Sequence, residues 1–366
     1  MRISDEKLTD RLAISILTWF FPPEAVERAI AHSGRMGARN RLLPPKVVVY
    51  FVLAMCMFPA EGYSDVARLL AEGMALGSGA CQERRHKPLH AIPTTAAISR
   101  ARMRLGSAPL EALFDDTVAR EAPAAPALPG ATFPQLRRRV LDGRIAVLPP
   151  SPENAAAYAP ERVTSQSRVA QPGIRVTVLA DNDTGTLLGA DLSHVQTSLP
   201  DVTKDLVSRV GKGDLLLADG DYARPLLWRR ASGTGAELLW SVPDWVRLPQ
   251  IGGPLGDNSY LSLLPSRDKD ARPTRRDTVR VLAAPPGGQR RLMTSILDPA
   301  AASAEQLRQA YAGHWTFEQA ADQLDTMRAG RPHSVRSRSP ETARQEIWGH
   351  LLVYSAIRSL ANNRVS

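Results

Sequence analysis

The sequence predicts an α/β fold in which an all-α N-terminal domain precedes a mixed-sheet core with a strand-rich insertion. Three observations lead to this prediction. Residues 1–120 contain a succession of helical patterns. Residues 121–130, EAPAAPALPG, have the composition of a linker. From 131 to 366, short strand patterns alternate with helical ones, which is typical of an α/β core.

The helices of the N-terminal domain are separated by proline and glycine. An apolar run ends at Pro22, and a proline stands at the first position of the next two helical patterns, where its missing N–H costs nothing. Ser64 is a suitable N-cap for the helix after them. The predicted helices are at 12–20, 23–33, 45–57, 64–72 and 94–105.

The helix predicted at 94–105 carries three arginines, Arg100, Arg102 and Arg104. It ends at Gly106, a typical C-terminal cap. Short helices that end in an arginine-rich one resemble a helix-turn-helix DNA-binding arrangement. A helical bundle with a solvated basic face explains this segment equally well.

The core begins with three successive strand patterns, and the turn sequence DNDTG at 181–185 joins the last two. The apolar run at 215–218 is that of a fully buried strand. Residues 244–290 are polar and predict a strand-and-loop insertion. The predicted strands are at 139–148, 174–180, 186–192, 215–218, 237–242 and 291–297, and the helices at 199–210, 225–231, 302–312 and 341–360. This order fits an RNase H-like topology, although other mixed α/β folds share it.

Composition points to a polyanionic partner and to a reducing compartment. The net charge is +9 and the pI about 9.9, which favours nucleic acid as the partner, although a GC-rich coding bias also raises the arginine content. Cys56 and Cys81 are the only cysteines and form no CxxC, so neither a disulfide framework nor a cysteine zinc site is expected. No apolar run is long enough to span a bilayer. We therefore expect a cytoplasmic protein.

The stretch 311–325, YAGHWTFEQAADQLD, predicts a helix with a polar face. Spacings of three, four and seven residues place Tyr311, His314, Glu318 and Asp325 on that face. For a single helix, the simpler interpretation is a solvated face. A functional interpretation requires other carboxylates to converge on Glu318.

Two more acidic residues lie in or directly after predicted strands, at positions where a carboxylate can serve a functional site. Asp142 lies inside an apolar strand, where a carboxylate is costly unless it is paired or metal-bound. Asp219 directly follows a buried strand, at the end where open α/β sheets bind ligands. Each is a common turn residue when taken alone. With Glu318 they form an oxygen ligand set suited to two hard divalent cations and to phosphodiester chemistry.

These residues resemble those of a known family, the DDE transposases of bacterial insertion sequences, in the IS-four group. The segment RLAISILTWFFPPEAVERAI resembles the start of its helical N-terminal domain, and VLDG and LLLADGDY resemble its first and second Asp motifs. YAGHWTFEQAADQLD falls on its Y-x2-R-x3-E-x6-K signature, and RSRSPETARQEIWGHLLVYSAIRSL resembles the helix that follows. The resemblance covers nearly the whole chain.

The resemblance implies an RNase H-like catalytic core and assigns roles to residues of this sequence. Asp142, Asp219 and Glu318 would be the metal-binding catalytic triad, with two Mg²⁺ ions that Mn²⁺ can replace. Double-stranded DNA, as terminal inverted repeats and target, would be the partner of a homodimer associated with the bacterial nucleoid. The resemblance places Tyr311 near the DNA backbone and His314 at a phosphate-contacting position. The basic residues of the sequence add further expected DNA contacts, in the loop after Glu318 and on the arginine-rich helix: Arg328, Arg331, Arg336, Arg338, Arg100, Arg102 and Arg104.

The activity that follows is cut-and-paste transposition by metal-dependent strand cleavage and transfer. Two alternatives stay open. His314 and Asp325 occupy the signature Arg and Lys positions, and the chain stops where relatives tend to continue, as expected of an impaired or truncated remnant that only binds DNA. A repressor-like module acting through residues 1–120 is the other alternative.

Overall fold

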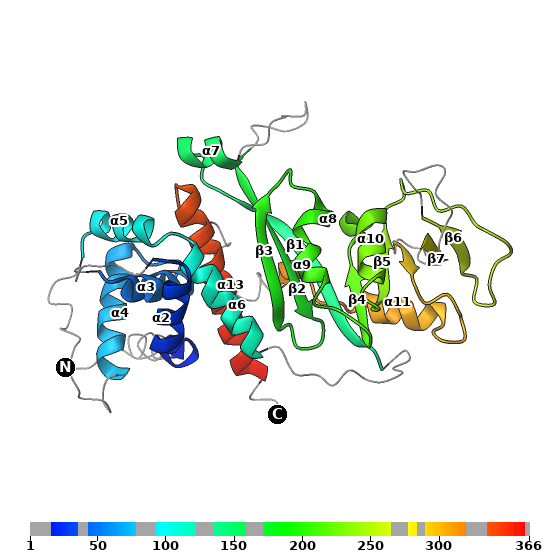
Figure 1. The fold of residues 1–366 in the computed structure, drawn as a ribbon, viewed down its shortest axis with the longest axis horizontal. Coiled ribbons are helices and arrows are strands. Elements are labelled where there is room, and N and C mark those ends of the chain that lie inside the picture. Colours follow the sequence, from blue (N-terminus) through cyan, green and yellow to red (C-terminus); the bar gives the residue numbers. More distant parts are fainter. Residues whose placement is uncertain are drawn as a thin grey trace. The chain divides into compact units, whose positions relative to one another are not determined.

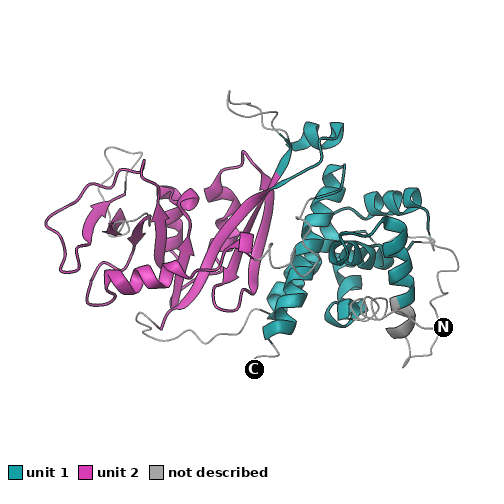
Figure 2. Ribbon diagram, turned by 180° about the vertical axis from the view of Figure 1, so that it is seen from behind, with its two compact units in different colours: residues 1–121, 146–173, 321–366 teal, residues 122–145, 174–320 magenta. Residues whose placement is uncertain are grey.

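The computed structural model describes residues 16–35, 43–77, 93–121, 135–158, 171–264, 277–283, 290–319 and 335–362. The chain divides into two compact units (Figure 2). Unit 1 comprises Met1–Glu121, Ala146–Gly173 and Ala321–Ser366, and unit 2 comprises Ala122–Ile145 and Ile174–Ala320. The first change of unit coincides with the predicted linker. The predicted core 131–366, however, is not one compact unit, because its C-terminal part belongs to the helical unit.

Unit 1 is helical, as predicted for residues 1–120, and it gains the C-terminal helix α13, Pro340–Asn362. Helix α3, Pro45–Met57, has the predicted bounds, and every residue from Val47 to Cys56 is buried. Helix α13 packs against α3, where Gly349 permits a close approach because a Cβ there would lie 2.7 Å from Cys56 Sγ. In the described part of unit 1, residues 16–20 are also helical, and the other helices are α2 (Pro23–His32), α4 (Tyr63–Gly77), α5 (Thr95–Leu105), α6 (Ala108–Glu121) and α7 (Pro152–Tyr158).

The helix caps agree with the sequence at one predicted end and differ at another. The Thr94 side chain accepts a hydrogen bond from the Ala97 N–H and caps α5, which ends at Gly106 with φ +70°. Ser64 is not the N-cap of α4, because the helix already includes Tyr63.

Within the described residues of unit 2, eight strands form one mixed sheet in the order β3-β2-β1-β4-β5-β8-β7-β6 (Figure 1). Strand β1 is parallel to β4 and β4 to β5, whereas β2 is antiparallel to β3. This is the RNase H-like arrangement. Strands β6 and β7 come from the predicted insertion and extend the sheet through β8. The bounds are β1 Arg137–Val147, β2 Gly173–Asp181, β3 Leu187–His194, β4 Asp214–Ala218, β5 Glu237–Val242, β6 Tyr260–Leu263, β7 Thr278–Leu282 and β8 Arg291–Thr294.

Both faces of the central strands are covered. In β4, Leu216 and Ala218 belong to the core on one face, together with Trp240, and Leu215 and Leu217 belong to the core on the other. Burial on both faces explains why this strand reads as an uninterrupted apolar run. The helical elements described in unit 2 are α8 (Leu199–Val202), α9 (Lys204–Val207), η1 (Gly220–Tyr222), α10 (Pro225–Ser232), α11 (Ala304–Ala312) and the short helical stretch 317–319.

The single helix predicted at 311–325 is wrong. Helix α11 ends at Ala312, residues 314–316 are not helical, and helical conformation returns at 317–319. Tertiary acceptors replace the helical ones, because the Trp315 N–H donates to Asn182 Oδ1 at 3.0 Å and the Phe317 N–H to Asp142 Oδ2 at 2.8 Å. The predicted polar face therefore does not exist as a helix face, and Asp325 lies outside the described residues.

Across the described ranges, no helix is long and apolar enough to cross a membrane.

Candidate active site

Strand register brings the first two acids together. Strands β1 and β4 run parallel, and Leu141 pairs with Ala218. Asp142 and Asp219 each follow one of these residues, so they occupy corresponding positions on neighbouring strands. Asp142-Gly143 is not a turn, because β1 continues to Val147.

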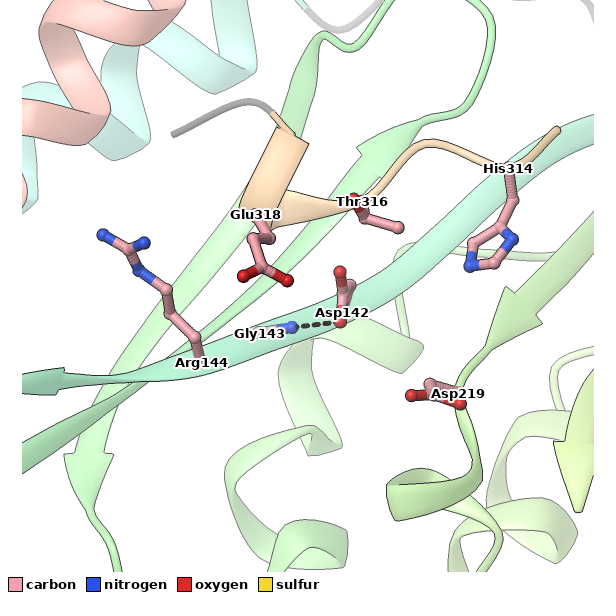
Figure 3. Close-up of a pocket in the computed structure, with 7 residues that line it drawn as sticks. All are labelled: Asp142, Gly143, Arg144, Asp219, His314, Thr316 and Glu318. Carbon is pink, nitrogen blue, oxygen red and sulfur yellow. Dashed lines mark hydrogen bonds between the residues drawn. The ribbon is translucent and has the colours of Figure 1, made fainter. Parts of the chain in front are cut away.

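Glu318 joins the two aspartates through the segment after α11. The hydrogen bond from the Phe317 N–H to Asp142 fixes the residue before Glu318 against β1. All three acids line one cavity of about 270 Å³, shown in Figure 3. The complete lining is Asp142, Gly143, Arg144, Asp219, His314, Thr316 and Glu318. Glu318 itself is exposed.

Asp142 is the more buried of the two aspartates. Its Oδ1 accepts the Gly143 N–H at 2.7 Å, and its Oδ2 accepts the Phe317 N–H. Burial raises the pKa of Asp142 above the ordinary value, and the neighbouring Asp219 charge adds to this. The two backbone hydrogen bonds and His314 oppose the rise without cancelling it.

Asp219 is surrounded by donors. Its Oδ1 accepts the Gly220 N–H at 2.6 Å, the Ser241 hydroxyl at 2.7 Å and Arg290 Nη1 at 2.9 Å. Burial acts to raise the pKa of Asp219, but the hydrogen bonds from Ser241 and Gly220 and the Arg290 charge outweigh it, so the pKa lies below the ordinary value. Asp219 is therefore the more readily ionised aspartate.

Two glycines leave no room for a side chain. A Cβ at Gly143 would lie 2.2 Å from the Val176 carbonyl oxygen, which would force β1 and β2 apart. A Cβ at Gly220 would lie 2.9 Å from Pro243 Cγ. The second contact explains why the residue after Asp219 is glycine in this chain.

Tyr311 and His314 stack beside the acids, with ring centroids 4.4 Å apart. The Tyr311 hydroxyl donates to the Ala218 carbonyl at 3.3 Å, and burial raises the pKa of Tyr311 to about 12. His314 Nδ1 lies 2.6 Å from the Tyr311 carbonyl oxygen. Because a carbonyl only accepts, Nδ1 carries the hydrogen, and a neutral His314 therefore has an acceptor at Nε2.

Two family models match the sequence. The model described as insertion element 4 transposase N-terminal matches residues 11–115. The model described as transposase DDE domain matches residues 134–356, which is more than half of the chain. The chain belongs to the DDE transposase family of insertion element 4. The resemblance seen in the sequence is thereby confirmed.

Known relatives agree with this assignment. The transposase InsG for insertion sequence element IS4 of Escherichia coli strain K12 is 25% identical over 349 residues, which cover 93% of this chain and 74% of InsG. The putative transposase InsZ of the same organism is 23% identical over 267 residues, covering 72% and 83%. A cryo-EM structure of the piggyBac transposase synaptic complex with hairpin DNA is 11% identical with a TM-score of 0.45, covering 96% of this chain and 75% of that one, a similarity too low to bear on function.

The arginines expected to contact DNA in this transposase are placed differently from one another. Arg100 and Arg104 are exposed on α5. Arg102, on the same helix, is 1% exposed, and its guanidinium donates to Gln345 Oε1, Ser337 Oγ and the Thr342 carbonyl oxygen. Arg102 therefore stabilises unit 1 and is withdrawn from the DNA-contacting set, because a buried guanidinium does not reach a phosphate.

The basic residues before α13 also differ. The Arg336 guanidinium donates to the carbonyl oxygens of Pro59 and Glu61 at 3.0 Å, so its charge is used within unit 1. Arg338 is exposed. Arg328 and Arg331 lie outside the described residues.

The residues around the cavity fit a divalent cation in donor type. Asp142, Asp219 and Glu318 supply only carboxylate oxygens, the ligands that Mg²⁺ and Mn²⁺ prefer. All described hydrogen bonds to Asp219 fall on Oδ1. Nevertheless, no group of three or more His, Cys, Asp or Glu among the described residues is arranged to hold a metal ion. The acids share one cavity, but their side chains are not closed around a common point.

Sequence reasoning missed two cationic residues at this site. Arg144 is not among the site residues expected from the sequence, yet it lines the cavity. Arg290 is the last residue of the predicted insertion 244–290, where nothing in the sequence links it to Asp219. The alternation of side chains along β1 is a signal for Arg144, because it places residues 142 and 144 on the same face. No comparable signal exists for Arg290.

Proposed function

We propose that this transposase binds the DNA ends of a bacterial insertion sequence and catalyses metal-dependent strand cleavage and strand transfer, as in cut-and-paste transposition. The observation that carries the proposal is the convergence of Asp142, Asp219 and Glu318 on one cavity from three separate elements of unit 2. Parallel strand register supports the first two positions, and the hydrogen bond from Phe317 to Asp142 supports the third.

Asp142, Asp219 and Glu318 would hold the metal, which we propose is Mg²⁺ as two ions, with Mn²⁺ as a substitute. Divalent ions at such sites lower the pKa of the attacking hydroxyl or water and stabilise the negative charge of the phosphoryl group. The chain contributes the orientation of the carboxylates. Gly143 and Gly220 N–H groups and Ser241 hold Asp142 and Asp219, and the Phe317 N–H ties the Glu318 segment to β1.

The proposed partners are the terminal inverted repeats of the element and the target DNA, bound by a homodimer. The net charge of +9 supports a polyanionic ligand. Exposed Arg100 and Arg104 on α5, and Arg338, are the remaining described arginines proposed to contact DNA. His314 and Tyr311 are proposed to lie near the DNA backbone at the cavity.

The test is nicking of duplex DNA that carries the terminal repeats of the element, with and without Mg²⁺ or Mn²⁺. We expect metal-dependent nicking by the wild type and its loss in Asp219→Ala. Asp221→Ala is the matched control, because Asp221 is a nearby exposed acid that does not line the cavity. Equal nicking by wild type and Asp219→Ala contradicts the proposal.

A second candidate function is DNA binding without cleavage. Two observations favour it: Arg290 is paired with Asp219, and the described acids form no closed metal site. A protein of this kind binds terminal-repeat DNA with wild-type affinity whether or not Asp142, Asp219 or Glu318 is changed. If His314, at the signature Arg position, is what limits activity, His314→Arg should bind terminal-repeat DNA more tightly than the wild type and should nick it. End binding and nicking equal to those of the wild type would contradict this role of residue 314.

A further inference from the structure

We infer that Arg144 binds the phosphate of the DNA strand that enters the acidic cavity, and so serves as a positioning residue for the scissile phosphodiester. This inference rests on the proposed function. It concerns a residue to which the family resemblance assigns no role.

The first argument is placement. Asp142 and Arg144 are two residues apart in β1, and side chains at that spacing emerge from the same face of a strand. Arg144 lines the same cavity as Asp142 and Glu318. In Figure 3 it lies on the Glu318 side of the cavity, and His314 lies on the other side. A phosphate held by the carboxylate-bound metal would therefore have a guanidinium at the edge of its site.

The second argument is orientation. The Arg144 guanidinium carbon lies 5.6 Å from the centroid of the Phe317 ring. A cation over an aromatic face is held in position without the use of its N–H groups in hydrogen bonds. Phe317 is itself tied to Asp142 by its backbone N–H. The same short segment thus positions a carboxylate, that of Glu318, and a cation, the Arg144 guanidinium, around one cavity.

The third argument is that the charge is available. Among the described residues, Arg144 forms no ion pair, although Glu318 lines the same cavity, whereas Arg138 and Arg139 of the same strand pair with Asp183 and Asp181. A guanidinium offers five N–H donors in a planar fork that matches two phosphate oxygens. At the edge of an acidic cavity, such a charge offsets the repulsion between the carboxylates and an incoming phosphodiester and adds to what the metal ions would provide.

The fourth argument is that no other cation fills this role in the lining. Arg144 is the only arginine or lysine that lines the described cavity. His314 has an acceptor at Nε2 when neutral, and Gly220 has no room for a side chain. Arg290 pairs with Asp219 and is not among the residues that line the cavity.

The test measures DNA binding without cleavage, with Ca²⁺ in place of Mg²⁺. Affinities of the full-length wild type and of Arg144→Ala are compared on two terminal-repeat duplexes, which are identical except that one carries a neutral methylphosphonate at the scissile position. We expect the wild type to bind the neutral duplex about tenfold more weakly, because a charge-assisted contact is lost. Arg144→Ala should bind the normal duplex about tenfold more weakly. The methylphosphonate should weaken its binding much less than it weakens that of the wild type, because only the metal contact to this phosphate is left to lose. For Arg144→Ala, the slope of log K against log [salt] should be smaller in magnitude by about 1 than for the wild type.

Two further variants test whether the loss in Arg144→Ala reflects the missing charge at this cavity. Arg144→Lys keeps the charge and should recover part of the affinity and of the methylphosphonate effect, which shows that a loss in Arg144→Ala is not misfolding. Arg224→Ala is the matched control, because Arg224 also lies 5.6 Å from an aromatic centroid, that of Trp245, but outside the cavity lining. It should retain the full methylphosphonate effect.

The inference is overturned if Arg144→Ala remains as sensitive to the methylphosphonate as the wild type. That result leaves the proposed function intact, since nicking and its dependence on Asp219 are measured separately. Conversely, absence of nicking by the wild type with an Arg144-dependent methylphosphonate effect rejects the catalytic proposal and retains the phosphate contact.

Discussion

The backbone N–H of Phe317 donates a hydrogen bond to Asp142 Oδ2 at 2.8 Å, across 175 positions of sequence. This contact connects the first acid of the site to the segment that carries the third. It also takes an N–H that a continuous helix would satisfy internally. One carboxylate therefore serves both as a candidate metal ligand and as the anchor of Glu318.

We predict that Asp142→Ala and Asp142→Asn separate these two roles. Both should reduce metal-dependent nicking by at least about 100-fold, because a ligand at the reacting phosphate is lost. Asn keeps one acceptor oxygen for Phe317, whereas Ala keeps none. The Phe317 amide should therefore exchange about tenfold faster in the Ala variant, as measured by hydrogen exchange. Equal exchange in both variants would show that the contact does not hold the segment.

Arg290 should compete with metal for Asp219. The two side chains pair at 2.9 Å and are 64% and 45% exposed. Such an exposed pair is weak. We therefore predict that Arg290→Ala tightens Mn²⁺ binding only about two- to fivefold, measured by calorimetry or by electron paramagnetic resonance.

Arg291→Ala is the control for this experiment. Its guanidinium donates to the carbonyl oxygens of Pro243 and Val246 rather than to a candidate metal ligand. Removal of that neighbouring charge should leave Mn²⁺ affinity nearly unchanged. The same gain in both variants would indicate a general charge effect and not competition at Asp219.

The arginines of α5 should divide into structural and DNA-contacting ones. Arg102→Ala should destabilise the protein by about 2–4 kcal/mol, because buried partners such as Gln345 Oε1 are left without a donor. Arg100→Ala and Arg104→Ala should change stability by less than about 0.5 kcal/mol. Each substitution should instead reduce the magnitude of the slope of log K for DNA binding against log [salt] by about 1. Thermal unfolding and a salt titration measure the two effects, and a stable Arg102→Ala protein would contradict the structural role.

Asp257 should make the stability of unit 2 sensitive to acid. It pairs with Arg280, which is fully buried, and accepts the Ser259 hydroxyl at 2.6 Å and the Ala304 N–H at 2.7 Å at the start of α11. Burial acts to raise the pKa of Asp257, but these hydrogen bonds and the Arg280 charge lower it below the ordinary value. Asp257→Asn should cost about 3 kcal/mol near neutral pH, since Arg280 loses its counter-charge.

The sign of the pH effect follows from the lowered pKa. The stabilisation by Asp257 is present above the unfolded-state pKa of about 3.9 and is lost as the pH falls through the lower pKa of the folded protein. The difference in melting temperature between wild type and Asp257→Asn should therefore be constant from pH 7 to about 5 and shrink below about 4. Asp244→Asn, at a fully exposed carboxylate, should show no such difference. A difference in melting temperature between wild type and Asp257→Asn that grows toward low pH would contradict a lowered pKa for Asp257.

Local sequence determined much of this protein. Proline at the first helical position located α2 and α3, and Gly106 marked the end of α5. The apolar run of β4 indicated a strand buried on both faces, as found. These features depend on a few neighbouring residues or on a continuous pattern, so they are readable along the chain. Asp142 and Asp219 were recognised in the same way, from their positions in or after such patterns, whereas Glu318 was singled out through a helix face that the structure does not contain.

The tertiary structure alone decided how those acids meet. Register between β1 and β4 aligned Asp142 with Asp219, and hydrogen bonds from Trp315 and Phe317 to distant side chains interrupted the helix that local propensity favours. Burial separated Arg102 from its exposed neighbours on α5, and pairing brought Arg290 to Asp219. Each is a contact between residues far apart in sequence, and its free energy depends on packing and charge that no local pattern encodes. The sequence by itself therefore determined the fold class and the candidate acids, whereas the folded chain decided which side chains surround them.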